Sequence, residues 1–545
     1  MHISLGPDRM ENLQPSTASA LAQIVATSAK VQERPTRIAD TVCNVLFVLL
    51  LVVNVIRTLH HAMWRDELQS FMLALYSSSP LSLLQKLKYE GHPGLWHLLL
   101  WMVTRVTSNP MWMQVLHIAL AIGVWILIYR WSPFSKLEKI LLLLSYFLFW
   151  EYFIISRNYV LIALMAFAFV ALRERRPRFD FILWLLLGLL ANAHIFGAIW
   201  SVALAAVLSI EAVRRRSVPI AGPVAYVILL VIAIGTIIKP ADFGPLAHNV
   251  QFNSSYPNAN LNVPLGPFVP LQLDSIREAF AFITQPEAAS IPEFWNSNST
   301  ADFVALTHAD TDHPVRLALV FAIPIVLCWL VTRDPLLVLE FALLYLGIVL
   351  FENRFFRYGD GARLHGIIFL ALIASAWGAR SRHSPAISSV CLLGTLLIVN
   401  ACGGVLTLAS ELRPFSEGYY AAAWIRSNDF ADTFLVGSRD AQISTVAGYL
   451  GRPIYYLECE CRGTFIVWNR KRQSLLSPQE FGDRLTRAIA LAPQRNAILI
   501  SYRPIIIDDL TSNAPNLSIV LLKSFTDATT TENFWIYRVR EKQPL

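Results

Sequence analysis

Charged residues are scarce in this sequence: Asp, Glu, Lys and Arg together make up 15% of its 545 residues. Soluble domains carry roughly 25%, so the shortage excludes an ordinary water-soluble globular protein. Apolar residues fill the difference, since 55% of the chain is hydrophobic and the mean hydropathy is +0.48. Several apolar runs approach the roughly 20 residues that a helix needs to cross roughly 30 Å of hydrocarbon. We predict a polytopic membrane protein with the lipid bilayer as its partner.

Cysteines and patterned basic charge are scarce as well. Six scattered cysteines are too few for a disulfide framework, and the one close pair, Cys459 and Cys461, is a weak signal for redox or metal chemistry. The net charge of +7 comes from short Lys and Arg clusters between apolar runs, without a basic stripe interleaved with aromatics. We therefore predict no nucleic-acid partner, and the basic clusters indicate membrane topology instead.

The N-terminal residues 1–37 lack both a strong period and the compact charged, apolar and cleavage regions of a secretory signal. Because they are rich in Ser, Ala and Gln, we predict a disordered cytoplasmic N-terminus. The first apolar run, which begins near Val42, is then expected to be an uncleaved anchor.

Eleven apolar runs are predicted to cross the membrane. They are Val42–Leu59, Met111–Tyr129, Leu137–Phe153, Tyr159–Leu172, Phe179–Ala193, Phe196–Val213, Ile220–Ile238, Val315–Val331, Leu336–Phe351, Ile367–Ala379 and Ile387–Ala409. Basic clusters, including those at Arg173–Arg178 and Arg380/Arg382, fall at alternate ends of these runs. Because Lys and Arg favour the cytoplasmic side, the N-terminus is predicted to be cytoplasmic and the C-terminus periplasmic, in a cell inner (plasma) membrane.

A shorter run, Leu95–Val106, is predicted not to cross. Its twelve residues reach only about 18 Å at about 1.5 Å per residue, well below the hydrocarbon thickness. We expect it to lie along the outer surface with Leu68–Tyr76 and Leu81–Leu87. The alternative is a short, tilted twelfth span.

The predicted fold is a polytopic α-helical membrane protein with a C-terminal extracytoplasmic α/β domain. Residues 38–410 form the transmembrane domain, with a first outer loop at 57–110 and a long outer loop at 239–314. In residues 411–545, strand-like runs alternate with helical patterns, which is typical of an α/β domain.

Three charged residues, Arg65, Asp66 and Glu67, follow the first span directly. Ionisable groups at a bilayer boundary are costly to desolvate, so they usually mark a functional site. Either carboxylate is suited to act as a general base toward a hydroxyl or amine. The alternative is an interfacial helix N-terminus, where acidic residues complement the helix dipole.

A second feature is the turn Tyr89–His97, in which Gly and Pro flank His92 and fix a sharp turn that opens a new helix. His92 is placed to donate to a phosphate or carboxylate, although a plain turn with a solvated histidine also fits. A third feature combines Glu151 and Arg157, at the ends of two consecutive spans on the same side as Asp66. They are either site residues or a satisfied ion pair.

A fourth feature is the turn that carries Arg354, Arg357, Arg363 and His365. Arginines on an outer-face turn run against the positive-inside rule, so an anion is expected to hold them there. Arginine suits a planar, bidentate grip on phosphate. The segment Thr307–His313 has metal-ligand residue types at a spacing that fits no metal site. We therefore predict no metal ligands, and a divalent cofactor has no support.

Together these motifs resemble the lipid-linked-sugar glycosyltransferases of the GT-C fold. The likeness lies in the Asp66-Glu67 pair, the His92-Pro93-Gly94-Leu95-Trp96 turn, and Arg157-Asn158-Tyr159 opening the span after Glu151. It is closest to bacterial members of the type of dolichyl-phosphate-mannose-protein mannosyltransferases and aminoarabinose transferases. It is good over roughly residues 40–210 and does not extend to the C-terminal domain.

The resemblance implies inverting transfer of one hexosyl or pentosyl unit from a polyprenyl-phosphate sugar donor to a glycan, lipid or protein acceptor on the periplasmic face. The resemblance implies that Asp66 is the base, that Glu67 is the second candidate for this role, and that His92 lies near the donor phosphate. Glu151 matches the family's second acidic residue less well, because Ile155 and Ser156 stand where that residue is usual. Arg354, Arg357 or Arg363 would bind phosphate.

Other functions remain as alternatives. A transporter or flippase for lipid-linked saccharides would place polar residues near the midplane and often carries internal repeats, which this sequence does not show. A glycan ligase would transfer a preassembled glycan, whereas the resembling transferases move one sugar. The sequence hardly distinguishes these two activities. A binding protein with a membrane anchor would not need eleven spans.

Overall fold

A computed structural model of the chain describes most of its length. The described residues are 40–175, 180–214, 220–243, 314–355, 362–473, 476–506, 512–530 and 532–542. The predicted disordered segment 1–37 and the segment Thr307–His313 lie outside them. The described part of the chain divides into two units, with the boundary between Val53 and Asn54.

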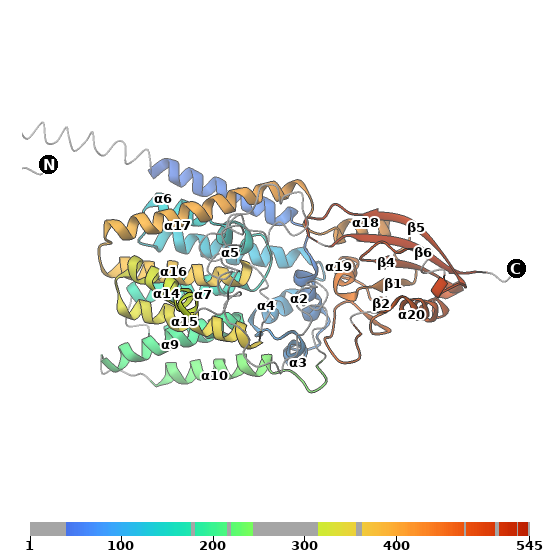
Figure 1. The fold of residues 1–545 in the computed structure, drawn as a ribbon, viewed down its shortest axis with the longest axis horizontal. Coiled ribbons are helices and arrows are strands. Elements are labelled where there is room, and N and C mark those ends of the chain that lie inside the picture. Colours follow the sequence, from blue (N-terminus) through green and yellow to red (C-terminus); the bar gives the residue numbers. More distant parts are fainter. Residues whose placement is uncertain are drawn as a thin grey trace, which may run out of the picture. The chain divides into compact units, whose positions relative to one another are not determined.

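Within the described residues, five helices are long and apolar enough to cross a membrane. They are Asp40–His60, α5 (Met111–Trp131), α9 (Ile195–Arg214), α16 (Ala362–Arg382) and α17 (Ile387–Leu406). In α16 the apolar stretch is Arg363–Arg382, and in α17 it continues to Ala409. Five further helices coincide with predicted spans: α7 (Tyr159–Arg175), α8 (Asp180–Ala193), α10 (Ala221–Ile237), α14 (Pro314–Thr332) and α15 (Pro335–Phe355). Figure 1 labels four of these helices, α7, α10, α14 and α15. Ten of the eleven predicted runs are thus single helices.

The predicted span Leu137–Phe153 is not one helix. The chain forms α6 (Lys136–Leu143) and then a separate π-turn, η2 (Phe147–Glu151). A side chain at Gly404 of α17 would meet the Leu144 carbonyl oxygen at 1.9 Å, so α17 approaches the backbone closely at the interruption. Such π segments are common at functional sites, and this one ends at Glu151.

Three short helices follow the helix Asp40–His60, as the sequence predicts. They are α2 (Arg65–Leu75), α3 (Pro80–Glu90) and α4 (Leu95–Thr104). The ten residues of α4 extend about 15 Å, so it is too short to cross the hydrocarbon upright.

Charged side chains gather at both ends of α16. Arg363 at its start contacts Asp66, and Arg382 at its end contacts Glu174 over 2.6 Å and Asp334 over 3.0 Å. The end near Arg382 holds further ion pairs: Arg173–Glu340, Arg173–Glu211 and Arg380–Glu138. The 20 residues between Arg363 and Arg382 cover about 30 Å, so the two groups of charges are separated by about one hydrocarbon thickness.

The C-terminal part of the chain forms a six-stranded sheet in the order β3-β2-β1-β4-β6-β5. The strands are β1 (Leu435–Ser438), β2 (Ile454–Tyr456), β3 (Cys461–Gly463), β4 (Asn496–Ser501), β5 (Leu517–Phe525) and β6 (Phe534–Glu541). Strands β2, β1 and β4 run parallel, and the other pairs are antiparallel. The α/β class of this region is confirmed; the sequence did not reveal β3, which has three residues.

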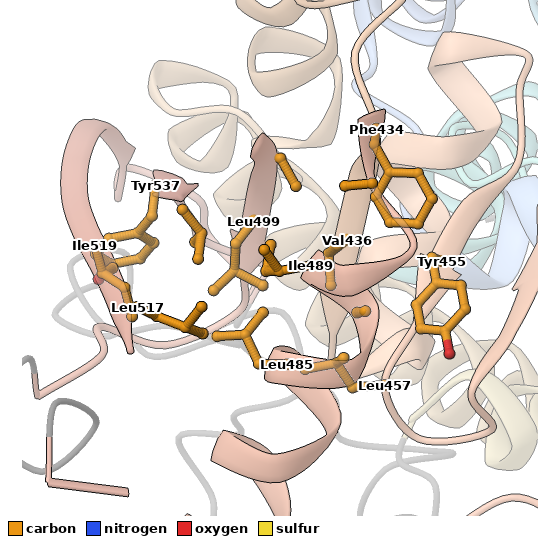
Figure 2. Packing of buried hydrophobic residues seen from close by; sticks show 14 of the residues in the cluster. Phe434, Val436, Tyr455, Leu457, Leu485, Ile489, Leu499, Leu517, Ile519 and Tyr537 are labelled. Carbon is orange, nitrogen blue, oxygen red and sulfur yellow. The ribbon is translucent and has the colours of Figure 1, made fainter. Parts of the chain in front are cut away.

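Helices cover both faces of the sheet. On one face, Leu485 and Ile489 of α20 (Pro478–Ala490) pack against Val436 and Leu499, as Figure 2 shows. On the other face, α18 (Gly418–Ser427) and α19 (Asp440–Leu450) pack on the alternate residues of the same strands. Because successive strand residues point to opposite faces, both sides of β1 and β4 are apolar.

A disulfide joins Cys459, in the connection between β2 and β3, to Cys461, the first residue of β3. The C-x-C pair is therefore a covalent crosslink here, while the other four cysteines are free thiols.

Candidate functional site

The carboxylate of Asp66 lies among three arginines from three separate parts of the chain. Arg363 Nη1 donates to Asp66 Oδ2 over 3.0 Å, and Arg157 Nη1 lies 3.2 Å from the same oxygen. Arg65 Nε lies 3.6 Å from Asp66 Oδ1. We call these four residues, all of them predicted from the sequence as site residues, the Asp66–arginine cluster.

Local structure explains why these side chains meet. Asp66 lies in the first turn of α2, Arg157 in the turn that precedes α7, and Arg363 in the first turn of α16. Tyr152 Oη donates to the Arg363 carbonyl oxygen over 2.6 Å, which fixes the start of α16 against the turn that carries Arg157. Gly366 permits this approach, because a Cβ there would lie 2.2 Å from the Phe147 ring.

The electrostatics of the cluster favour an ionised Asp66. Burial by itself would raise the pKa of Asp66, but Arg157, Arg363 and Arg65 more than offset that effect and hold the pKa well below its usual range. The Asp66 side chain is 26% exposed, whereas Arg157 and Arg363 are 10% and 11% exposed. Asp66 is therefore a charged group that solvent can reach, backed by arginines that are mostly covered.

Glu67, the neighbouring carboxylate, is fully buried. Ser156 N donates to its Oε1 over 2.7 Å, while His61 Nε2 and Trp64 N lie 3.0 Å and 3.1 Å from its Oε2. Glu67 thus ties the start of α2 to the turn that holds Arg157. Since both of its oxygens bind internal donors, Glu67 orients its neighbours, and Asp66 is the member of the pair that faces outward.

Glu151 is buried at the end of η2, where it accepts a hydrogen bond from Tyr146 Oη over 3.1 Å. The ion pair that the sequence allowed between Glu151 and Arg157 does not form, because Arg157 pairs with Asp66. Glu151 is therefore a buried residue that is not part of the Asp66–arginine cluster.

The predicted turn around His92 is present. Gly91 ends α3 at φ +77°, a conformation that favours glycine, and a Cβ there would also meet Lys239 Nζ at 2.6 Å. The His92 ring lies 5.4 Å from the ring of His194. Burial, with His194 and Arg157 adding to it, lowers the pKa of His92 well below its usual value. His92 is thus a neutral imidazole whose charged form is disfavoured by burial and by nearby Arg157.

The structure adds two charged residues that the sequence reasoning did not include among the site residues. Glu90 accepts a hydrogen bond from Gln69 Nε2 over 2.8 Å, and burial raises its pKa to about 7 in spite of that bond and of nearby Lys239. Lys239 Nζ donates to the Tyr89 carbonyl oxygen over 3.4 Å. A signal for Lys239 was present, since a lysine directly after an apolar span on the predicted outer face breaks the positive-inside pattern.

Of the remaining predicted residues, the structure describes the side chain of His365 but not those of Arg354 and Arg357. His365 is buried in α16, two residues after Arg363 and so pointing to a nearly opposite side of the helix. Arg354 lies on the last turn of α15, but its side chain is outside the described residues, as is all of Arg357.

Chemically, the cluster combines a reachable anion with three fixed cations. Arginines that gather around one carboxylate also suit a phosphate, which accepts several charge-assisted hydrogen bonds at once. A carboxylate beside them suits proton transfer from a group held next to that phosphate. Over the described ranges, no three His, Cys, Asp or Glu side chains gather in a group that could hold a metal ion.

Comparison of the chain with protein-family models, with curated proteins and with solved structures finds no significant match. Function is therefore inferred from the chemistry of the Asp66–arginine cluster and its place in the fold.

Proposed function

We propose that the protein is an integral-membrane, inverting glycosyltransferase. It moves a sugar from a polyprenyl-phosphate donor to a hydroxyl or amine of a glycan, lipid or protein acceptor. The observation that carries the proposal is the Asp66–arginine cluster, which combines a reachable carboxylate with three arginines at one end of the apolar helix α16.

In the proposed reaction, the bond between sugar C1 and the donor phosphate oxygen breaks while an acceptor oxygen or nitrogen bonds to C1 from the opposite side. The acceptor proton passes to Asp66, and the polyprenyl phosphate leaves with the electron pair of the broken bond. Negative charge therefore grows on the phosphate. Arg157 and Arg363 already lie beside Asp66, so a small turn of their guanidinium groups is enough to stabilise that charge.

The same arginines control when Asp66 becomes a base. While Arg157 and Arg363 lie 3.2 Å and 3.0 Å from its oxygen, Asp66 is ionised but weakly basic. A donor phosphate competes for these guanidinium groups because it carries a full negative charge. As the arginines turn to the phosphate, the pKa of Asp66 rises and the carboxylate accepts a proton more readily. Donor binding is thus expected to activate the base.

We place the cluster at the periplasmic face of an inner (plasma) membrane that the eleven predicted spans cross. Two observations support this orientation. At the opposite end of α16 lie Arg173, Arg380 and Arg382, which belong to the basic clusters that the positive-inside rule assigns to the cytoplasm. The Cys459–Cys461 disulfide is typical of an oxidising compartment, and its domain contacts α2, the helix of Asp66.

The test supplies purified protein in vesicles with polyprenyl-phosphate sugars labelled in the sugar, together with candidate acceptors. Transfer of the label to an acceptor with inverted configuration supports the proposal. Label that crosses the bilayer while still bound to its lipid would indicate a flippase. Movement of a preassembled glycan, with single sugars left unused, would indicate a ligase.

A further inference from the structure

The first turn of α2 is held by a carboxylate from the C-terminal domain. Glu532 Oε1 accepts a hydrogen bond from the backbone N–H of Arg65 over 3.0 Å, across a sequence separation of 467 residues. Helix N-termini leave N–H groups without intrahelical partners. Trp64 stands at the N-cap of α2 and has no side-chain oxygen to accept from them, so the acceptor for Arg65 N comes from outside the helix.

Glu532 is itself fixed in place. Its side chain is 1% exposed, and its second oxygen accepts hydrogen bonds from Ser416 Oγ over 2.7 Å and Thr445 Oγ1 over 3.0 Å. Both hydroxyls belong to the C-terminal domain, one before α18 and one on α19. The position of the carboxylate is therefore set by that domain and not by α2.

Other contacts join α2 to the C-terminal domain further along the helix. Gln69 uses both ends of its amide on Ile466: Nε2 donates to the carbonyl oxygen and Oε1 accepts from the backbone N–H, each over 2.9 Å. Gly448 of α19 lies so close that a Cβ there would meet Leu68 Cβ at 3.1 Å. The helix is thus fastened at its first turn and along its buried face.

We propose that the C-terminal domain is part of the catalytic unit, and that Glu532 is a positioning residue that sets the first turn of α2, and with it Asp66, against Arg157 and Arg363. The expected effect of Glu532 on turnover rests on the proposed function. The positioning itself is a property of the fold and is measured separately.

The expected consequence concerns turnover more than binding. Displacement of a reacting group by about 1 Å costs roughly 100-fold in rate. In Glu532→Ala, the donor phosphate still meets Arg157 and Arg363, but Asp66 is held less tightly relative to them, because Glu67 alone then ties the start of α2 to the turn of Arg157. We expect kcat to fall about 10- to 100-fold with the KM for the donor changed less than threefold.

The experiment compares Glu532→Ala with Glu480→Ala in the full-length protein. Glu480 accepts from Ser477 N over 2.8 Å in the cap of α20, which covers the sheet face that α18 and α19 do not. The control thus removes a capping carboxylate of the same domain without touching α2. Hydrogen exchange of peptides that span Met63–Gln69 is measured together with kcat and KM. We expect faster exchange and lower kcat for Glu532→Ala, and neither change for Glu480→Ala.

A conservative variant separates positioning from loss of the domain. Glu532→Gln keeps an acceptor for the Arg65 N–H, so slow exchange and a kcat within about threefold of the wild type are expected. If Glu532→Ala does not accumulate, Thr445→Val removes one of the two hydroxyls that hold Glu532 while keeping the side-chain volume. It should then accelerate exchange over Met63–Gln69.

Unchanged exchange in both Glu532→Ala and Thr445→Val would overturn the inference. A selective rise in acceptor KM would also overturn it, because the domain would then bind the acceptor. Faster exchange in a protein that transfers no sugar would retain the positioning role and reject the proposed function.

Discussion

Replacement of Asp66 by Asn is the most direct perturbation of the proposed chemistry. The change removes one negative charge and keeps an oxygen that can accept from Arg363 Nη1, which donates over 3.0 Å. Loss of a general base costs about 10²- to 10⁴-fold in rate. Donor affinity should not fall, because three guanidinium groups no longer share their charge with a carboxylate. We therefore expect kcat to drop by that factor while the donor Kd is unchanged or lower.

Structural damage from this substitution is expected to be limited. A unit charge pair at about 4 Å interacts by about 4 kcal/mol at an effective dielectric of roughly 20. The Asp66 side chain is 26% exposed and Arg65 is 25% exposed, so water takes up part of the lost interaction. The matched control is Asp334→Asn at the opposite end of α16, where Asp334 lies 3.0 Å from Arg382. It makes the same chemical change to a similar ion pair away from the cluster.

The assays are transfer of labelled sugar, equilibrium binding of the donor, and thermal melting for both variants. Asp334→Asn should retain transfer within a few-fold. Full transfer by Asp66→Asn would remove Asp66 as the base. Loss of donor binding in Asp66→Asn would show that the carboxylate holds the donor and that the arginines are not its phosphate site.

The adjacent carboxylate offers a contrast within the same prediction. Glu67 is fully buried and accepts from Ser156 N, Trp64 N and His61. Glu67→Gln replaces one carboxylate oxygen by an amide NH₂ group, which faces a backbone N–H and cannot accept from it. The lost hydrogen bond to a charged group is worth about 1.5–3 kcal/mol of stability. We expect a clearly lower melting temperature for Glu67→Gln than for Asp66→Asn. A reversed order of the two melting temperatures would contradict the separation of roles.

Three further predictions concern binding, pH and topology. Arg363→Gln should raise the donor Kd about 10- to 100-fold in equilibrium binding, since it removes a charged hydrogen-bond donor worth about 1.5–3 kcal/mol. Burial, opposed by Arg65, raises the pKa of Glu532 from 4.5 to about 7, so its contribution to stability is present below about pH 4.5 and lost as the pH rises through about 7. The melting temperature should therefore decline over that interval less in Glu532→Gln than in the wild type. Cys459 and Cys461 should resist alkylation until reduced, and an impermeant reagent should then label them from the periplasmic side only; labelling from the cytoplasm would reverse the proposed orientation.

Local patterns in the sequence predicted most elements of the fold. Apolar runs such as Met111–Tyr129 became single helices because their length and composition leave few alternatives. Strand-like runs in residues 411–545 were recognisable from β-branched and aromatic residues between turn signals, and β6 (Phe534–Glu541) is an example. The strand β3 was not recognisable, because Cys461–Gly463 is defined by its pairing with β2 and not by its own composition.

The break in the predicted span Leu137–Phe153 shows a second limit of local patterns. The hydropathy average does not break at Leu144–Tyr146, because one serine and one tyrosine among leucines and phenylalanines lower it too little to end the apolar run. At the end of the helix, α17 approaches the backbone of Leu144 at Gly404, a residue far away in sequence. Tertiary contact, which hydropathy does not report, decides such interruptions.

The candidate site was predictable residue by residue but not in its pairings. Asp66, Arg157 and Arg363 were each identified by an ionisable group at an expected membrane boundary, yet the sequence suggested Glu151 as the partner of Arg157. The contact between Arg363 and Asp66 spans 297 residues and that between Arg65 and Glu532 spans 467. No local period encodes contacts over such separations; they depend on how α16 and the C-terminal domain pack on α2.

The length of α16 connects this packing with the proposed substrate. Its stretch from Arg363 to Arg382 has 20 residues and rises about 30 Å, close to the thickness of the hydrocarbon. When the apolar middle of α16, which is buried among the other helices, spans the depth of the hydrocarbon, Arg363 and Arg382 reach opposite headgroup layers. A polyprenyl chain holds its phosphate in one such layer, so the donor phosphate and the Asp66–arginine cluster occupy the same depth. This depth supports the proposed lipid-linked donor, because a water-soluble sugar nucleotide would not be confined to the headgroup layer.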